Sequence, residues 1–258
     1  MNRTNVVHQP SSAPVGESHS QIQSHKRSLA RCEASRTRPD RPRVFDLAGL
    51  SWDLLDDVFA PIHSPSTGVA LDFLGLSPSA RPRTAGSRGS MLEIGCGTGV
   101  VSVVAALDGY ERVVGTDINL HAVRNTELNV ARHGVGDRMR VAHSDLFDSL
   151  PPGERFDVIF WSSNYVLAPE DYAYRNVCEQ AFVDPGYAAH QRFLEQAVRW
   201  TTPGGRVLLH FTNRGDTGLL RRLAAECGRD LRLRESRTVR EGEDAVEHLL
   251  LEVTPSAK

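Results

Sequence analysis

Three glycines at alternate positions follow a short apolar run in the segment Met91-Leu-Glu-Ile-Gly-Cys-Gly-Thr-Gly-Val100. The apolar run predicts a buried strand, and the apolar residues that follow the glycines predict a helix beginning at Val100. Glycine lets the backbone turn sharply and come close to a ligand, because it has no Cβ atom. The segment therefore predicts a strand, a ligand-binding turn and a helix, which together form the first unit of a doubly wound α/β domain.

From this segment onward, short apolar runs alternate with helical patterns. Strands are expected at Met91–Ile94, Arg112–Thr116, Met139–Ala142, Phe156–Trp161, Arg206–Phe211, Asp230–Val239 and Ala245–Val253. Helices are expected at Val100–Asp108, Leu120–His133, Ala189–Thr202 and Thr217–Cys227. The alternation predicts right-handed crossovers and a mostly parallel sheet. The last two runs lie so close together that they predict an antiparallel hairpin at the edge of the sheet.

The chain before this domain divides into two parts. Residues 1–43 are polar and hold eight Lys or Arg against three Asp or Glu. We expect a disordered basic tail there, with a nucleic-acid-binding arm as the alternative. Residues 44–90 are expected to cover the ligand pocket, with a short helix or turn at 52–59, a helix at 68–76 and a polar loop at 81–90. Residues 91–258 then form the ligand-binding α/β domain.

Composition excludes several other classes of protein. Hydrophobic residues make up 40% of the chain and charged residues 24%, which is typical of a globular domain. No apolar run approaches the ~18 residues that cross a bilayer. The four cysteines show no metal-like spacing; they are Cys32, Cys96, Cys178 and Cys227. We therefore expect a cytoplasmic protein with reduced thiols, no bound metal and no membrane partner.

Three acidic residues stand where an adenosine ligand needs them. Asp117 ends the next strand, 20 residues after Gly97, where a carboxylate accepts hydrogen bonds from the two ribose hydroxyls. Asp145 follows the third strand and suits the adenine amino group. Glu93 precedes the glycines, where it suits a cationic amino-acid end better than a pyrophosphate. Because the glycine spacing is GxGxG with Val100 in the sixth place, the pattern favours S-adenosylmethionine (SAM) over a dinucleotide.

Residues 44–253 resemble a class I SAM-dependent methyltransferase. The segment Leu92–Gly99 is similar to the first motif of that family, and Asp117, Asp145 and the strand Phe156–Trp161 are similar to the next three in order and spacing. The segment Trp200–Leu209, with its Pro-Gly-Gly turn, resembles the family's entry to the fifth strand. The resemblance implies a Rossmann-like sheet with strand order 3-2-1-4-5-7-6. It also implies SAM as the cofactor, bound by Glu93, Gly95, Cys96, Gly97, Gly99, Asp117, Ile118, Asp145 and Leu146.

On the substrate side, the chain is similar to the branch of the family that carries Asn-Pro-Pro-Tyr after the fourth strand. Here the corresponding residues are Ser162-Ser-Asn-Tyr165. The resemblance implies that Ser162, Asn164 and Tyr165 present the nucleophile. The loop that follows is polar and aromatic, and such loops form the binding crevice of these sheets. Its candidate substrate contacts are Asp171, Tyr172, Tyr174, Tyr187 and His190, and His63 and Thr67 resemble a lid over the pocket.

These features favour an enzyme that methylates a small, amino-acid-like molecule in specialised biosynthesis by direct in-line transfer. Three alternatives remain open. The first is a protein or nucleic-acid N-methyltransferase, which the basic tail favours. The second is an enzyme of the same fold that cyclises SAM or transfers its 3-amino-3-carboxypropyl group, releasing methylthioadenosine. The third is a SAM-binding partner subunit without activity. The sequence makes no prediction of the oligomeric state.

Overall fold

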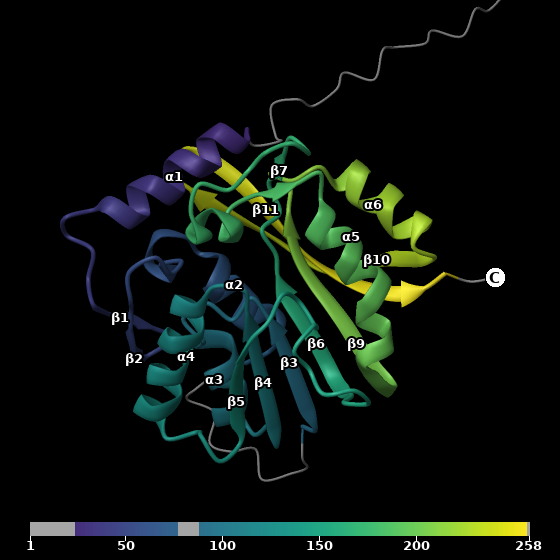
Figure 1. Cartoon of the computed structure of the whole chain (residues 1–258), viewed down its shortest axis with the longest axis horizontal. Coiled ribbons are helices and arrows are strands. Elements are labelled where there is room, and N and C mark those ends of the chain that lie inside the picture. The colour runs from purple at the N-terminus through teal and green to yellow at the C-terminus, as the bar shows by residue number, and fades with distance from the viewer. Residues whose placement is uncertain (1–23, 77–87, 257–258) are drawn as a thin grey trace, which may run out of the picture.

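A single seven-stranded sheet forms the centre of the computed structural model, which describes residues 24–76 and 88–256 (Figure 1). Its strands are β3 (Ser90–Ile94), β4 (Arg112–Asp117), β5 (Met139–His143), β6 (Phe156–Ser162), β9 (Thr201–Thr212), β10 (Arg229–Glu241) and β11 (Asp244–Pro255). Their spatial order is β10-β11-β9-β6-β3-β4-β5, and only β10 and β11 run antiparallel to their neighbours. Numbered along the chain within the sheet, this order is 3-2-1-4-5-7-6. The predicted fold and strand order are confirmed.

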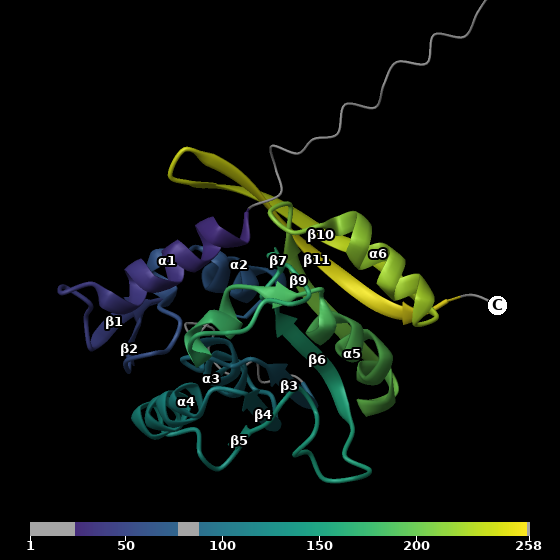
Figure 2. The same ribbon diagram turned by 45° about the horizontal axis from the view of Figure 1, so that its top comes forward.

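Helices cover both faces of the sheet because successive strand residues point to opposite sides (Figure 2). Met91 and Leu92 of β3, for example, belong to two different buried apolar clusters. The first cluster contains residues of α2 (Ser66–Phe73), α3 (Val100–Leu107) and α4 (Leu120–His133). The second contains residues of α5 (Ala188–Gln196), the 3₁₀ turn η3 (Ala197–Trp200) and α6 (Thr217–Glu226). The sequence prediction of a doubly wound domain is thereby confirmed in both layers.

Several predicted boundaries need correction. The helix expected at 189–202 ends at Gln196 and continues as the 3₁₀ turn η3. Strand β9 begins at Thr201 rather than Arg206, because its first residue pairs with Phe156 across a register shift. The hairpin of β10 and β11 is longer than predicted, and Figure 2 shows its turn reaching past the rest of the sheet.

The prediction of disorder over residues 1–43 is wrong for the part that the structure describes, while residues 1–23 lie outside it. His25–Thr37 form helix α1. Ser28, Leu29 and Cys32 are its buried residues, and the latter two belong to an apolar cluster with Phe182 and Val183. These three buried residues span only about one helical turn, so the sequence shows no helical periodicity there. Phe182 and Val183 lie about 150 residues further along the chain, and only the fold brings them into contact with α1.

A hairpin follows α1, made of β1 (Val44–Leu47) and β2 (Leu50–Asp53). Trp52 is therefore in a strand and not in the short helix or turn expected at 52–59. Two fully buried amides of α4 hold this segment: Asn129 Oδ1 accepts from the Asp53 amide at 2.8 Å, and Asn125 Oδ1 from the Leu55 amide at 2.7 Å. The helix expected at 68–76 begins and ends slightly earlier, as α2, and most of the expected loop at 81–90 lies outside the described residues.

An insertion between β6 and α5 crosses the carboxyl ends of the central strands. It contains β7 (Leu167–Ala168), the 3₁₀ turn η2 (Val177–Ala181) and β8 (Asp184–Pro185), and β7 and β8 pair in parallel. Helix α1 packs on it, and the hydroxyl of Ser28 donates to the carbonyl of Phe182 at 2.9 Å. Another 3₁₀ turn, η1 (Pro61–His63), precedes α2. Among the described residues, no helix has both the length and the apolar character to span a membrane.

Candidate functional site

A cavity of ≈ 490 Å³ lies at the carboxyl ends of β3, β4 and β6. Its floor is the glycine turn after β3, and its walls come from the loops after β4, β5 and β6. Residues of α1, η1 and η2 line it from above, and we call these three elements the roof. The volume lies in the range of about 300–1,000 Å³ that is usual for small-molecule and cofactor sites. The position is the one at which open α/β sheets bind their ligands.

The three glycines of this turn have different structural roles. All three have positive φ, at +67° for Gly95, +58° for Gly97 and +79° for Gly99. A Cβ on Gly97 would meet no atom within 4 Å, while the Gly97 amide donates to Asp117 Oδ2 at 2.8 Å. A Cβ on Gly99 would lie 2.7 Å from Cγ2 of Thr126. Gly95 and Gly97 line the cavity, whereas Gly99, predicted as a cofactor contact, instead allows α3 and α4 to pack closely.

Asp117 is held at the end of β4 by two backbone amides. Its Oδ2 accepts from Gly97, and its Oδ1 accepts from the amide of Asn119 at 2.9 Å. Burial raises the pKa of this carboxyl although the two amides oppose that shift. Each carboxylate oxygen keeps lone-pair capacity for a further donor. A ligand with two adjacent hydroxyls is therefore suited to this position, which lines the cavity as predicted.

Glu93 is almost fully buried beside the glycine turn and lines the same cavity. Its Oε2 accepts from the amide of Ser102 at 2.9 Å and from the hydroxyl of the same residue. Burial raises the pKa of Glu93 to about 8, despite these two hydrogen bonds. The side chain is therefore mostly protonated at neutral pH, and a cationic group placed beside it would favour its ionised form.

The raised pKa of Glu93 predicts a stability that falls as pH increases. Between its ordinary value of 4.5 and about 8, the folded protein holds a proton that the unfolded chain releases, so unfolding becomes easier across this window. Glu93→Gln carries no titrating proton and removes this slope. We expect the variant to be more stable than the wild type at pH 8.5 by on the order of 2 kcal/mol. Urea unfolding from pH 5 to 9 measures this; parallel pH profiles for the two proteins would contradict it.

Asp145, Ile118 and Leu146 also line the cavity. Both oxygens of Asp145 accept from Arg192 of α5, at 2.8 and 2.9 Å. This ion pair was not foreseen from the sequence, and it ties the loop after β5 to α5. Cys96 completes the predicted cofactor residues at the cavity; its thiol lies 3.3 Å from the hydroxyl of Thr126.

Asn164 lies beyond the end of β6 with its side chain fixed by the insertion. Its Nδ2 donates to the carbonyls of Gln180 and Val183, both at 2.9 Å. Because both partners are carbonyl oxygens, the amide nitrogen must face them. Its Oδ1 is buried and has no partner among the described residues, and Asn164 lines the cavity. Buried acceptors are nearly always paired, so this oxygen is available for a ligand donor.

Ser162 and Tyr165 stand on either side of this amide. The Tyr165 ring packs edge-on to Phe211, and its backbone carbonyl accepts from the hydroxyl of Tyr187 at 2.6 Å. Ser162 Oγ lies 3.0 Å from Nδ1 of His210, a buried residue of β9. The three predicted catalytic residues therefore all line one cavity.

The sequence analysis overlooked His210 and its neighbour His248. His210 Nε2 lies 2.9 Å from His248 Nδ1, and both rings are buried between β9 and β11. The available signal was a histidine within each of two apolar runs that were already predicted as strands. A polar residue on a buried strand needs a partner, and that requirement could have singled out both residues.

Only one of the five predicted substrate contacts reaches the cavity. Tyr174 lines it, and its hydroxyl donates to the carbonyl of Val183 at 3.1 Å. Asp171 is exposed on the insertion, and the hydroxyl of Tyr172 donates to Glu179 Oε2 at 2.8 Å. These two residues lie outside the lining of the cavity.

Tyr187 and His190 are in the core and not at the cavity. Neither side chain is exposed. Tyr187 donates to Tyr165 and accepts from the amide of Asp216, and His190 Nδ1 lies 2.6 Å from Asp184 Oδ2. Their expected role as substrate contacts is not supported, because the insertion turns inward at β8 and carries both rings beneath it.

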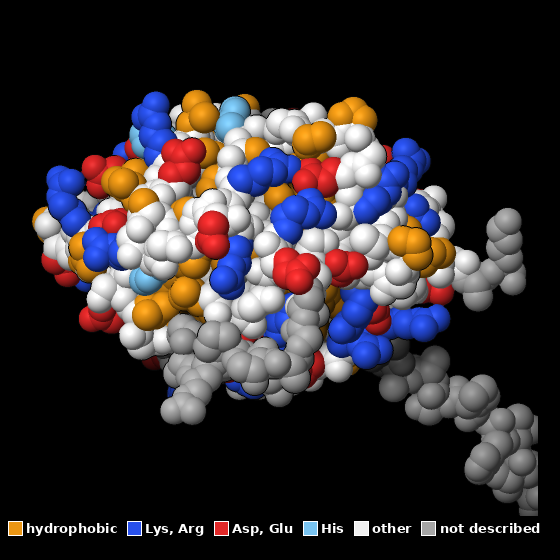
Figure 3. All heavy atoms as spheres, turned by 90° about the horizontal axis from the view of Figure 1, so that it is seen from below, with side chains coloured by type: hydrophobic (Ala, Val, Ile, Leu, Met, Phe, Trp, Pro, Cys, Tyr) orange, Lys and Arg blue, Asp and Glu red, His pale blue; other side chains and the backbone are white. Residues whose placement is uncertain are grey.

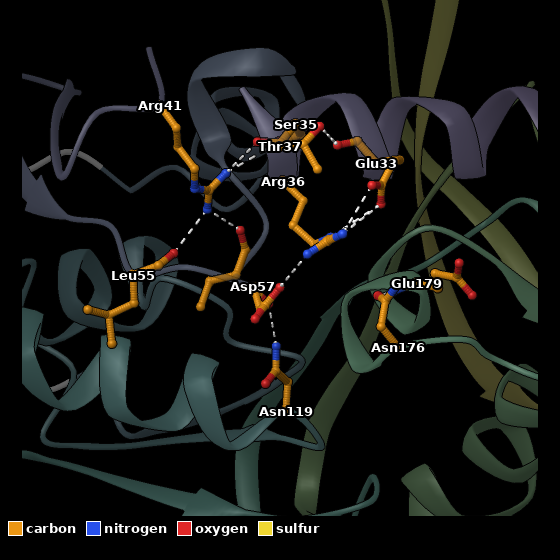
Figure 4. A network of polar contacts seen from close by, with 11 residues as sticks. Glu33, Ser35, Arg36, Thr37, Arg41, Leu55, Asp57, Asn119, Asn176 and Glu179 are labelled. Carbon is orange, nitrogen blue, oxygen red and sulfur yellow. Dashed lines mark hydrogen bonds and ion pairs between the residues drawn. The ribbon is translucent and has the colours of Figure 1, made fainter. Parts of the chain in front are cut away.

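Arginines of α1 and its connection fasten the roof (Figure 4). Arg36 pairs with Glu33 on its own helix and lies 3.8 Å from Asp57. The carbonyl of Asp57 accepts from the Asn119 amide side chain at 2.7 Å, which connects the roof to the loop after β4. Half-buried Arg41 donates to the carbonyls of Ser35, Leu55 and Val58 at 3.0, 3.0 and 2.6 Å.

Loss of the Arg41 guanidinium is expected to weaken this connection. Arg41→Ala leaves three partly buried carbonyls without their donor, so we expect a destabilisation of about 2–3 kcal/mol in urea unfolding. Arg38→Ala is the matched control, because among the described residues the exposed Arg38 side chain pairs with Asp40 alone, and its loss should change stability far less. Equal effects of the two variants would contradict the assigned role of Arg41.

Comparison with known proteins agrees with this site. The family profile described as a methyltransferase domain matches residues 91–182, from β3 through the carboxamide of Asn164 and into the insertion. The chain is thus similar to class I SAM-dependent methyltransferases. A putative protein N5-glutamine methyltransferase of Methanocaldococcus jannaschii is 32% identical over 120 residues, which cover 45% of this chain and 58% of that protein. A bifunctional methyltransferase of Rickettsia bellii is 25% identical over 171 residues, covering 61% and 31%.

The chain also matches solved structures in its fold. A putative transferase of Pyrococcus horikoshii superposes with a TM-score of 0.54 at 18% identity, covering 83% of this chain and 72% of that one. The chain spans less than two thirds of the length of the two curated relatives named above. SAM is the cofactor of the family, and the donor set of the cavity fits it. Asp117 suits a ribose diol, and the raised pKa of Glu93 would be lowered by an ammonium group.

Proposed function

We propose that this protein is a methyltransferase that transfers the methyl group of SAM to a nitrogen or oxygen atom of a small molecule that carries an N–H or O–H donor. The observation that carries this proposal is the buried Oδ1 of Asn164, a residue that lines the cavity. This oxygen has no partner among the described residues, while the amide nitrogen of the same side chain is held by two carbonyls. A donor on the acceptor molecule would satisfy this oxygen. Such a contact would also fix which atom faces the methyl group.

When bound, SAM supplies an electrophilic methyl group on a sulfonium centre. The protein then has to hold the nucleophile in line with it and exclude water, and near-attack positioning is worth roughly 7–11 kcal/mol. In the proposed arrangement Asp117 and Glu93 bind the cofactor, while Ile118 and Leu146 flank its adenine and Asp145 lies beside it. Asn164 and Ser162 accept hydrogen bonds from the acceptor.

A small acceptor is favoured by the roof. Helix α1 and turn η2 line the cavity from above, and Ser28 ties the helix to the insertion. The cavity of ≈ 490 Å³ must hold both cofactor and acceptor. A macromolecule could present no more than a single side chain or base to this space. We therefore place a small molecule first, in agreement with the amino-acid-like substrate expected from the sequence.

A protein glutamine is the second candidate. The relative from Methanocaldococcus jannaschii is named a putative protein N5-glutamine methyltransferase, and a primary carboxamide would also suit the Asn164 oxygen. A nucleic acid is the third candidate. Binding to phosphates favours clustered Lys and Arg. The face shown in Figure 3, at the amino ends of the parallel strands and away from the cavity, instead has interspersed basic and acidic side chains, so a nucleic acid would have to bind from the cavity side.

Calorimetry with SAM and with S-adenosylhomocysteine, followed by mass spectrometry of the same mixtures, tests the proposal. We expect both ligands to bind, SAM to stay intact alone, and S-adenosylhomocysteine to form when a set of small amides, amines and alcohols is added. Turnover confined to glutamine peptides would favour the second candidate. Methylthioadenosine formed without any acceptor would instead show attack within SAM, and methylthioadenosine formed only when an acceptor is added would show aminocarboxypropyl transfer. Either result would exclude methyl transfer as the reaction.

A further inference from the structure

We propose that Ser162, His210, His248 and Glu241 form a proton relay that carries the acceptor's proton out of the cavity. The inference rests on the proposed function, because methylation of an N–H or O–H group leaves a proton that must depart. It adds three residues, His210, His248 and Glu241, to the two that we placed beside the acceptor.

The four side chains form one continuous line across one face of the sheet, from strand to neighbouring strand. Ser162 Oγ lies 3.0 Å from His210 Nδ1, and His210 Nε2 lies 2.9 Å from His248 Nδ1. His248 Nε2 then lies 3.4 Å from Glu241 Oε1, an ion-pair distance rather than a regular hydrogen bond. The line crosses from β6 through β9 to β11 and ends at the last residue of β10. Each of the three contacts therefore joins side chains of two neighbouring strands.

The two ends of the line lie in different surroundings. Ser162 lines the main cavity. Glu241 lines a second, smaller hollow together with Arg214 and Asp244. Arg31 and His63 line both spaces, so this hollow lies next to the main cavity under the roof. Between them, both imidazoles are almost completely buried, and the ring of Phe73 packs edge-on to His210. A proton that enters at Ser162 can therefore leave at the hollow beside Glu241, near the edge of the sheet, rather than through the opening of the main cavity.

The ion pair at the Glu241 end determines the direction of the two hydrogen bonds in the line. Arg214 pairs with Glu241, and Arg31 lies 3.8 Å from it, so the carboxylate is kept ionised and accepts. His248 must then carry its proton on Nε2, which leaves Nδ1 as an acceptor. His210 donates to it from Nε2 and accepts at Nδ1. The Ser162 hydroxyl therefore donates to His210 and turns its lone pairs toward the cavity, where it can accept from the acceptor molecule.

One proton can pass along each contact in the line, and the numbers of atoms and charges stay balanced. As the C–N or C–O bond to the methyl group forms, the acceptor's proton passes to Ser162 Oγ and the hydroxyl proton of Ser162 passes to His210 Nδ1. The Nε2 proton of His210 passes to His248, and that of His248 passes to Glu241. The carboxyl group then releases one proton to solvent, and the electron pair of the broken N–H or O–H bond stays on the methylated atom.

The electrostatics of the line limit the class of acceptor. Burial, with His248 beside it, lowers the pKa of His210 to about 3, so this ring transmits a proton without storing it. Burial would raise the pKa of Glu241, but His248 and Arg214 hold it below the ordinary value. Such a base accepts only from a group that becomes strongly acidic as the methyl arrives. That condition describes an amide nitrogen or a hydroxyl oxygen, and not an alkylammonium.

Nitrogen-15 NMR of the full chain with S-adenosylhomocysteine tests the direction of the relay without any acceptor. We expect both His210 and His248 to be neutral and protonated at Nε2. A proton on Nδ1 of His210 would make Ser162 a donor toward the cavity and overturn the relay, as would a charged His210 ring. Because no acceptor is needed, this result decides the relay even if the proposed methyl transfer fails.

Kinetics with an acceptor from the screen then separate a relay from a structural pairing. We expect Glu241→Gln and His210→Phe each to lower kcat about 10²-fold, with KM and S-adenosylhomocysteine affinity unchanged. The solvent deuterium isotope effect on kcat should change in both variants, and Glu241→Asp should restore part of the rate. His133→Phe is the matched control, because this histidine packs on Trp52 away from the cavity. Wild-type kcat in folded Glu241→Gln would overturn the relay.

Discussion

Asp117→Ala is expected to weaken binding of both SAM and S-adenosylhomocysteine by about 10²–10³-fold. The carboxylate accepts from the amides of Gly97 and Asn119, so its loss removes the proposed ribose contact and also releases the glycine turn. Hydrogen bonds to a charged group are worth about 1.5–3 kcal/mol each, and a tenfold change in affinity is about 1.4 kcal/mol. Calorimetric titration of the purified variant measures the effect.

The control for this variant is Asp137→Ala. Asp137 is exposed after α4, and its one ion pair within the described part of the chain is with the neighbouring Arg138, so ligand affinity should match the wild type. Thermal unfolding without ligand shows whether Asp117→Ala remains folded at the titration temperature. If a folded Asp117→Ala protein bound S-adenosylhomocysteine within threefold of the wild type, the cofactor would have to lie elsewhere in the cavity.

Asn164→Ala is expected to lower kcat by about 10²-fold while leaving cofactor affinity nearly unchanged. The variant removes the only buried amide oxygen that we place on the acceptor, and misplacement by about 1 Å can cost this much in rate. Cofactor binding should survive, because Asp117 and Glu93 lie on other loops of the cavity. Initial rates with an acceptor from the screen, together with calorimetry, separate the two effects.

The variant also removes the hydrogen bonds to Gln180 and Val183, so loosening of the insertion has to be controlled. Asn176→Ala does this. Its Oδ1 accepts from the amide of Glu179 at 3.3 Å at the start of η2, and it does not line the cavity. A comparable fall in kcat for both variants would show that order in the insertion matters rather than the Asn164 oxygen.

The central sheet was predictable because its signals are local. Strand β3 and the glycine turn stand next to each other in the sequence, and parallel strands joined by helices admit few topologies. Helix α4 was predicted with the bounds that the structure has. Asn119 caps its first turn through the amide of His121, and Gly134 ends it with a positive φ. Positions of Glu93, Gly97, Asp117 and Asp145 at the cavity follow from this topology.

The errors concern contacts that only the folded chain creates. Helix α1 has a weak pattern of its own and is ordered by the insertion, so its composition resembled a disordered tail. Tyr187 and His190 have the residue types of a binding loop, but β8 turns them into the core. His210 and His248 are 38 residues apart and meet only because β9 and β11 pair side by side. The hydrophobic pattern of a single segment does not reveal contacts between residues that are far apart in the sequence.

The cavity is built by two separate pieces of chain, and this has a consequence for how the protein can diverge. Loops of the sheet make the half that holds the cofactor, whereas α1 and the insertion make the roof around Asn164. Neither α1 nor β7–β8 belongs to the seven-stranded sheet. Substitutions there can change the shape offered to an acceptor without touching the strands or the glycine turn. Descendants of one ancestor can therefore acquire new acceptors while keeping the same cofactor and the same framework.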